Sequence, residues 1–143
     1  ETSDDEISLS GYHILLAEDN LLNLEIAEFI LTDAGAVVTK ACNGEEALHL
    51  FMESSPCEYD IILMDIMMPV MDGYQTTRAI RSLDRPDAKT IPILAMTANA
   101  FAEDRQKTYA AGMNEHLTKP LDTELLLKTI AKYTPEKKAP MTP

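Results

Sequence analysis

The sequence predicts an α/β fold in which a parallel five-stranded sheet lies between two layers of helices. Five short apolar segments recur along the 143 residues, and a helical pattern follows each of them. Three of the five are mostly apolar, as strands buried on both faces are. Strands that alternate with helices pair in parallel, because each crossover helix returns the chain to the same edge of the sheet.

The expected strands are Tyr12–Ala17, Ala36–Ala41, Tyr59–Met64, Ile91–Met96 and Glu115–Thr118. The first, third and fourth are the most apolar and therefore belong at the centre of the sheet. Right-handed crossovers leave few possible arrangements. The flavodoxin-like order 2-1-3-4-5, a (βα)5 three-layer sandwich, fits this length and this number of strands.

The helix after the first strand is apolar on two sides. Residues placed about 100° apart form two apolar stripes. We expect one stripe to face the sheet, and it holds Leu22, Ile26, Phe29 and Ile30. The other stripe is then left towards solvent, and it holds Leu24, Ala27 and Leu31.

The other four helices have recognisable ends. Asn43 can cap the second helix, with Glu46 as its capping-box partner. The third is expected over 73–83 and the fourth over 101–111, with Gly112 as the C-cap of the fourth. Asp122 can cap the last helix, whose expected core side consists of Leu125, Leu126 and Ile130.

Composition and charge limit the classes of function. One domain is expected over 12–133, between a polar tail at 1–11 and a tail rich in Pro and Lys at 134–143. The net charge of −12 argues against direct nucleic-acid binding, which needs a basic surface. No signal pattern or membrane-length apolar run is present. We therefore expect a cytoplasmic domain without direct membrane contact. Because the first residue is Glu, it is expected to be a processed product or a piece of a longer chain, which can itself be membrane-anchored.

Charged and hydroxyl residues follow four of the five strands. Glu18 and Asp19 come after the first strand, Asp65 after the third, Thr97 after the fourth and Lys119 after the fifth. A single Asp after a strand is usually a turn residue or a helix cap. Since the carboxyl ends of parallel strands share one edge, the joint pattern instead indicates a site there.

The residue types at this edge favour phosphoryl chemistry. Crowded carboxylates need a cation, and donors that are all oxygen suit Mg²⁺. Lys119 is a point charge suited to a phosphoryl group, and Thr97 can donate a hydrogen bond to one. Asp65 can act as a carboxylate nucleophile that forms an acyl phosphate.

Four motifs carry a family resemblance: "LLAEDN", "IILMDIMMPVMDG", "ILAMTANA" and "LTKP". In order and spacing the chain resembles the receiver domain of two-component response regulators, over residues 12–133. It is most similar to the receivers of hybrid sensor histidine kinases. The resemblance implies that Asp65 accepts phosphate from a phosphohistidine on a histidine kinase or a histidine phosphotransfer protein.

The resemblance also implies roles for the surrounding residues. Asp19, Asp65 and the backbone carbonyl of Met67 would hold Mg²⁺, with Glu18 acting through water. Lys119 would pair with the phosphoryl group, Thr97 would move to bind it, and the Lys119–Pro120 peptide would be cis. His116 takes the place where the family usually has a Tyr or Phe switch residue. The partner would dock on the exposed stripe of the first helix, which was predicted as Leu24, Ala27 and Leu31.

Several other functions are also compatible with the sequence. A stand-alone response regulator would use the same chemistry as a hybrid kinase receiver. The domain would catalyse its own phosphorylation and slow dephosphorylation, while any kinase activity would belong to a parent chain. An FMN-binding domain, an aspartyl phosphatase or a purely structural interaction domain could share the fold. Against the first two, Glu18 and Asp19 would repel a phosphate that lacks a metal, and Met67 stands where such phosphatases have a second Asp.

Overall fold

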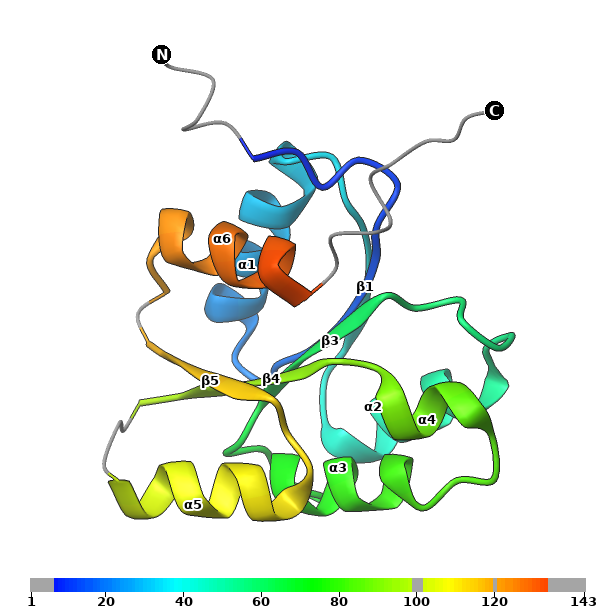
Figure 1. Ribbon diagram of the computed structural model, residues 1–143. Coiled ribbons are helices and arrows are strands. Elements are labelled where there is room, and N and C mark those ends of the chain that lie inside the picture. Colours follow the sequence, from blue (N-terminus) through cyan, green and yellow to red (C-terminus); the bar gives the residue numbers. More distant parts are fainter. Residues whose placement is uncertain (1–6, 99–101, 120, 134–143) are drawn as a thin grey trace.

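Five parallel strands lie in the order β2-β1-β3-β4-β5 (Figure 1), which confirms the predicted order. They are β1 (His13–Ala17), β2 (Val37–Ala41), β3 (Ile61–Asp65), β4 (Ile93–Thr97) and β5 (Glu115–Thr118). The computed structural model describes residues 7–98, 102–119 and 121–133. Residues 1–6, 99–101, Pro120 and residues 134–143 lie outside these ranges.

The central strands bury both of their faces. In β3, Ile62 and Met64 pack into one hydrophobic core, while Ile61 and Leu63 pack into the other. All five residues of β3 are buried, including Asp65 at its end. This two-sided burial explains the uninterrupted apolar run in the sequence, and it places Asp65 on a strand that is held from both sides.

Helices cover both faces of the sheet (Figure 1). On one face lie α1 (Leu21–Asp33) and α6 (Thr123–Tyr133). On the other lie α2 (Gly44–Glu53), α3 (Gly73–Arg81), α4 (Pro86–Thr90) and α5 (Ala102–Ala111). Helix α4 was not predicted, because its five residues are too few to form a periodic pattern. Within the described ranges, no helix combines the length and apolar composition that a membrane span requires.

The predicted helix ends are largely confirmed. The Asn43 side chain accepts a hydrogen bond from the backbone N–H of Glu46 (2.8 Å). The Glu46 carboxylate accepts from Cys42 N–H (2.6 Å), one residue earlier than a capping box requires. Asp122 Oδ1 accepts from Leu125 N–H (3.1 Å), and Gly112 follows α5 with φ of +106°. Phe101, the predicted first residue of the fourth helix, lies outside the described residues.

The prediction for α1 was wrong about which side faces the sheet. The side chains buried beneath this helix are those of Leu24, Ala27 and Leu31. They are spaced by three and four residues, so they form one stripe just as the opposite side does. Because α1 is apolar on both sides, its periodicity fits either orientation equally well. The small side chain of Ala27 suits the side where helix and sheet approach closely.

The opposite side of α1 is the one that faces solvent. Leu22, Ile26 and Phe29 are 66%, 47% and 70% exposed. Ile30, which was expected on the core side, is half-buried and packs at the margin of the core. The helix therefore presents a large apolar surface, but it is made of different residues from those predicted.

Two smaller differences concern the ends of the domain. Leu9, assigned to the N-terminal tail, is fully buried, and its N–H donates to Ala34 O at 2.7 Å. The packed part of the chain therefore begins before Tyr12. In α6, Leu126 and Ile130 are buried as predicted, whereas Leu125 is 54% exposed.

Candidate functional site

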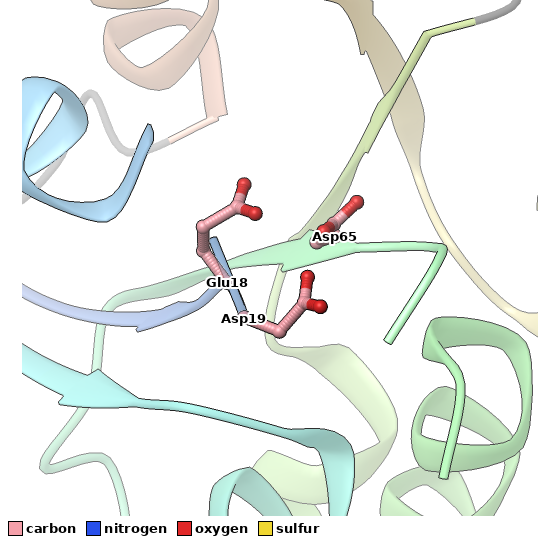
Figure 2. Close-up of side chains that lie close together, drawn as sticks. All are labelled: Glu18, Asp19 and Asp65. Atoms are coloured by element: carbon pink, nitrogen blue, oxygen red, sulfur yellow. The ribbon is translucent and has the colours of Figure 1, made fainter. Parts of the chain in front are cut away.

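Three carboxylates come together where β1 and β3 end (Figure 2). One oxygen of each of Glu18, Asp19 and Asp65 lies within 4.8 Å of the others. The two strands are neighbours, with Ala17 opposite Met64, so the residues that follow them share one edge. Glu18 and Asp65 are 2% and 3% exposed, whereas Asp19 is exposed to solvent. The predicted proximity of the three acids is confirmed.

The backbone around Glu18 is fixed on both sides. Its N–H donates to Ala41 O (3.0 Å), which extends the pairing of β1 with β2. Its carboxylate accepts from Asn20 N–H (3.1 Å), and the Asn20 side chain accepts from Asn23 N–H (3.0 Å) to cap α1. Asn20 was not among the predicted residues, although an Asn directly before an apolar helix is a typical N-cap.

Asp65 is held by the continuation of β3. Ile66 N–H donates to Met96 O (3.1 Å), and Gly73 N–H donates to Ile66 O (2.9 Å). Met67 N–H lies 3.4 Å from Asp65 Oδ1, a long hydrogen bond. Met67 therefore lies beside the acids, and the role of its carbonyl oxygen as a metal ligand stays a prediction.

Lys119 supplies the positive charge among the acids. Its Nζ lies 2.8 Å from Glu18 Oε1 and 3.3 Å from Asp65 Oδ1. Burial lowers the pKa of Lys119, but the hydrogen bonds and charges of Glu18 and Asp65 outweigh burial and raise it overall. Lys119 therefore stays protonated and ties the two buried carboxylates together.

One lysine does not satisfy Asp65. Burial, followed by the hydrogen bond and negative charge of Glu18, raises the pKa of Asp65 to about 7, although Lys119 opposes this. A carboxylate with such a pKa is short of positive charge and hydrogen-bond donors. Near neutral pH, the buried charge of Asp65 is therefore stabilised by protonation or by a bound cation. It is also removed when the carboxylate is converted to a covalent derivative.

The donor set fits Mg²⁺. All side-chain donors are carboxylate oxygens, and they include the exposed Asp19, which leaves a side open for water and phosphate oxygens. A bound divalent ion would supply the positive charge that Lys119 alone does not provide.

Thr97 and His116 lie on the strands beyond β3. Thr97 ends β4 and is buried, and its carbonyl accepts from Lys119 N–H at 2.8 Å, so the two residues lie together at the same edge. His116 is half-buried in β5, opposite Ala95 of β4. The switching roles of both residues stay predictions, and the expected cis peptide at Pro120 lies outside the described residues.

A small pocket connects the acids with α1. It has a volume of about 80 Å³ and is lined by Glu18, Asn23, Ile26, Lys119 and Leu121. The exposed side of α1 is therefore continuous with the acid-bearing edge. The sequence analysis missed Ile26 as part of this surface, because the pattern of α1 does not distinguish its two apolar sides.

Comparisons with known proteins agree with this geometry. The response regulator receiver domain family matches residues 14–131. Hybrid signal transduction histidine kinase I of Dictyostelium discoideum is 36% identical over 99% of the chain, and the chain spans only 9% of that kinase. The receiver domain of sensor histidine kinase PA1611 from Pseudomonas aeruginosa, solved with magnesium in its active-site cleft, is 37% identical with a TM-score of 0.79. That alignment covers 88% of this chain and 99% of the PA1611 chain.

A third relative was solved together with its partner. This structure is a complex from Saccharomyces cerevisiae of the receiver domain of Ssk1 with the histidine phosphotransfer protein Ypd1. It matches the present chain with 26% identity and a TM-score of 0.79. This match covers 90% of the present chain and 92% of the other. The strand order, the acids at the ends of β1 and β3, and the family match over most of the chain lead to one conclusion. The chain belongs to the response regulator receiver domain family of two-component signalling.

Proposed function

We propose that this chain is a phosphoacceptor switch domain in which Asp65 takes a phosphoryl group from a phosphohistidine donor. The observation that carries the proposal is the state of Asp65. It is a buried strand-end carboxylate beside one lysine and two further acids, with a pKa raised to about 7. Such a group serves no evident need of the fold, because burying a charge without full compensation costs stability.

The transfer is a substitution at phosphorus. An Asp65 oxygen attacks the phosphorus atom, the P–N bond to the donor imidazole breaks, and the imidazole nitrogen keeps the bonding electron pair and takes a proton from water. Mg²⁺, held by Asp19, Asp65 and the Met67 carbonyl with Glu18 acting through water, would neutralise charge on the transferring oxygens. Lys119, already 3.3 Å from Asp65 Oδ1, would exchange its contact for one with the new phosphoryl group.

Two residues would report the phosphorylated state. Thr97 would donate a hydrogen bond from its hydroxyl to a phosphoryl oxygen, and this bond would draw the end of β4 towards Asp65. His116, in the neighbouring strand, would adjust its side chain in response. Since imidazole titrates near neutral pH, His116 could make the response sensitive to pH.

A helical partner that presents phosphohistidine would dock on the exposed side of α1. Leu22, Ile26 and Phe29 form an apolar surface next to the acids. A monomeric protein gains nothing from exposing large side chains in a row, and such surfaces commonly mark interfaces. The solved complex of Ypd1 with the Ssk1 receiver shows that a related domain binds a phosphotransfer protein.

Charge around this surface constrains the partner. The sequence of α1, LLNLEIAEFILTD, has three acids and no Lys or Arg, and the chain carries a net charge of −12. The partner face should therefore combine an apolar centre with a basic rim, and association should slow as salt is added.

The parent protein is proposed to be a hybrid sensor histidine kinase with this domain on its cytoplasmic side. The relatives with matching receivers include such kinases, of which the chain covers about a tenth. A stand-alone regulator is the second candidate, favoured by a 14.6 kDa relative in Leptolyngbya boryana, 92% of which the chain covers.

The direct test uses acetyl phosphate and Mg²⁺. The chain should gain one phosphoryl group that hydroxylamine removes, as it does from an acyl phosphate. Asp65→Asn should abolish labelling, while the exposed Asp84→Asn should label as the wild type does. Labelling of Asp65→Asn, or full labelling in EDTA, would contradict the proposal.

The same preparation separates the rival functions. A flavin-binding domain would be yellow as purified, and a phosphatase would hydrolyse phosphate esters steadily rather than retain one phosphoryl group. A purely structural domain would show no response to either phosphate donors or Mg²⁺.

A further inference from the structure

The loop between β3 and α3 packs against the first residue of α2. Gly44 is buried there, and an added Cβ would overlap both the Thr76 hydroxyl and the Met71 carbonyl oxygen. The carbonyl carbon of Met71 would lie 3.0 Å from that Cβ. One of these neighbours is a side chain that can be truncated, but the other is backbone of the loop. Any residue larger than Gly would therefore displace the loop itself.

The loop has an unusual internal geometry. Met71 N–H donates to Pro69 O (2.7 Å), which closes a three-residue turn around Val70. Val70 is 75% exposed and has φ of +71°, a conformation that β-branched residues rarely adopt. Among the described residues, the Val70 side chain belongs to neither hydrophobic core, so core packing does not impose this backbone. A strained turn persists only when its surroundings determine it, and Gly44 is one of those surroundings.

The loop also carries a residue of the proposed metal site. Met67 lies at its start, beside Asp65 Oδ1. At its other end, the Thr76 hydroxyl donates to Asp72 O (2.8 Å) at the start of α3. Met71 lies only four residues after Met67 in this loop, so we expect a displacement of the Met71 carbonyl to shift the Met67 carbonyl as well.

We propose that Gly44 is a positioning residue for the metal site. The lack of a side chain on α2 lets the Met71 carbonyl approach, and this contact places the loop so that the Met67 carbonyl reaches the metal. The inference rests on the proposed function, in which Met67 contributes a ligand. Gly44 itself touches neither the metal nor the phosphoryl group.

The test compares Gly44→Ala, Thr76→Ala and the double variant Gly44→Ala/Thr76→Ala. Mg²⁺ affinity is measured from amide NMR shifts of the folded protein, and stability from urea unfolding without metal. Gly44→Ala should lose stability and bind Mg²⁺ about tenfold more weakly, or worse. The double variant should recover part of the lost stability because one overlap is gone, yet keep the weak Mg²⁺ binding because the overlap with Met71 remains.

Controls separate positioning from folding. Thr76→Ala alone, which keeps Gly44, should bind Mg²⁺ more tightly than either Gly44 variant. Gly112→Ala, at a residue with φ of +106° after α5, should be destabilised without a change in Mg²⁺ affinity. Wild-type affinity in folded Gly44→Ala, affinity that returns together with stability in the double variant, or failure of both Gly44 variants to fold would overturn the proposal. An absence of Mg²⁺-dependent shifts in the wild type would instead refute the proposed function itself.

Discussion

Two buried aspartates in this chain each lie beside a cation, yet their pKa values shift in opposite directions. Asp87 makes a bidentate pair with Arg85 (2.7 and 2.8 Å) and also accepts from Cys57 N–H at 2.8 Å. The Arg85 hydrogen bonds are the main reason that the pKa of Asp87 falls to about 2. The pKa of Asp65 rises to about 7, because burial and Glu18 outweigh a single shared lysine.

The difference separates a structural carboxylate from a reactive one. Arg85 also donates to Phe51 O (3.0 Å) and Ser54 O (3.1 Å) and lies over the Phe51 ring, so the pair with Asp87 joins α4 to the end of α2. Asp87 has its donors in place. Asp65 does not, and a bound metal ion can supply the positive charge that it lacks.

The largest expected effect comes from breaking the structural pair. Arg85→Met leaves the Asp87 carboxylate buried without its cation, and it should lower the free energy of unfolding by about 3 kcal/mol or more in urea denaturation. Replacing both partners, as in Arg85→Met with Asp87→Leu, should recover part of that loss. A loss below about 1 kcal/mol would place this pair among ordinary surface ion pairs.

The same division between folding and function should separate the two sides of α1. Leu31→Ala removes a fully buried side chain and should cost about 3 kcal/mol of stability. Leu22→Ala with Phe29→Ala, on the exposed side, should change stability by less than about 1 kcal/mol.

The exposed pair should matter instead for the partner. Leu22→Ala with Phe29→Ala should slow transfer from a phosphohistidine protein by about tenfold, while labelling by acetyl phosphate stays at the wild-type rate. Loss of both activities would mean that these residues support folding. An unchanged transfer rate would remove the docking surface from the proposal.

The lowered pKa of Asp87 predicts that its contribution to the stability of the fold depends on pH. A carboxyl with a folded-state pKa lowered to about 2 stabilises the fold fully above its unfolded pKa, about 4, and the stabilisation is lost as pH falls towards 2. Asp87→Asn should therefore be less stable than the wild type by about 2 kcal/mol near neutral pH, and this difference should shrink below about pH 4. Thermal unfolding of both proteins across acid pH measures this, and a constant deficit would contradict it.

Asp65 should show the opposite dependence on pH. Its raised pKa means that the folded state binds the proton more tightly than the unfolded state, so stability falls as pH rises from about 4 to 7. Metal-free Asp65→Asn should therefore gain stability relative to the wild type as the pH rises from about 4 to about 8. If Asp65→Asn instead lost stability relative to the wild type as the pH rose, the pKa values of the two aspartates would not shift in opposite directions.

The strand order and the acid cluster were predictable from the sequence because both depend on local patterns. Apolar runs locate the strands, and parallel pairing brings their carboxyl ends to one edge whatever the details of packing. Glu18, Asp19, Asp65 and Lys119 lie at or just after the carboxyl ends of their strands, so their proximity follows from the strand order alone. The local capping pattern likewise predicted Asn43 and Asp122 correctly, since a cap depends only on residues three or four positions apart.

Tertiary packing decided what local patterns leave equivalent. The two apolar sides of α1 have the same periodicity, and only contact with the sheet selected Leu24, Ala27 and Leu31 for burial. The pair of Arg85 with Asp87 gains its role from the carbonyl of Phe51, 34 residues away. Gly44 shows its importance only against Met71 of another element. These features depend on surfaces that meet only after the chain has folded, so no window of sequence contains the information that would specify them.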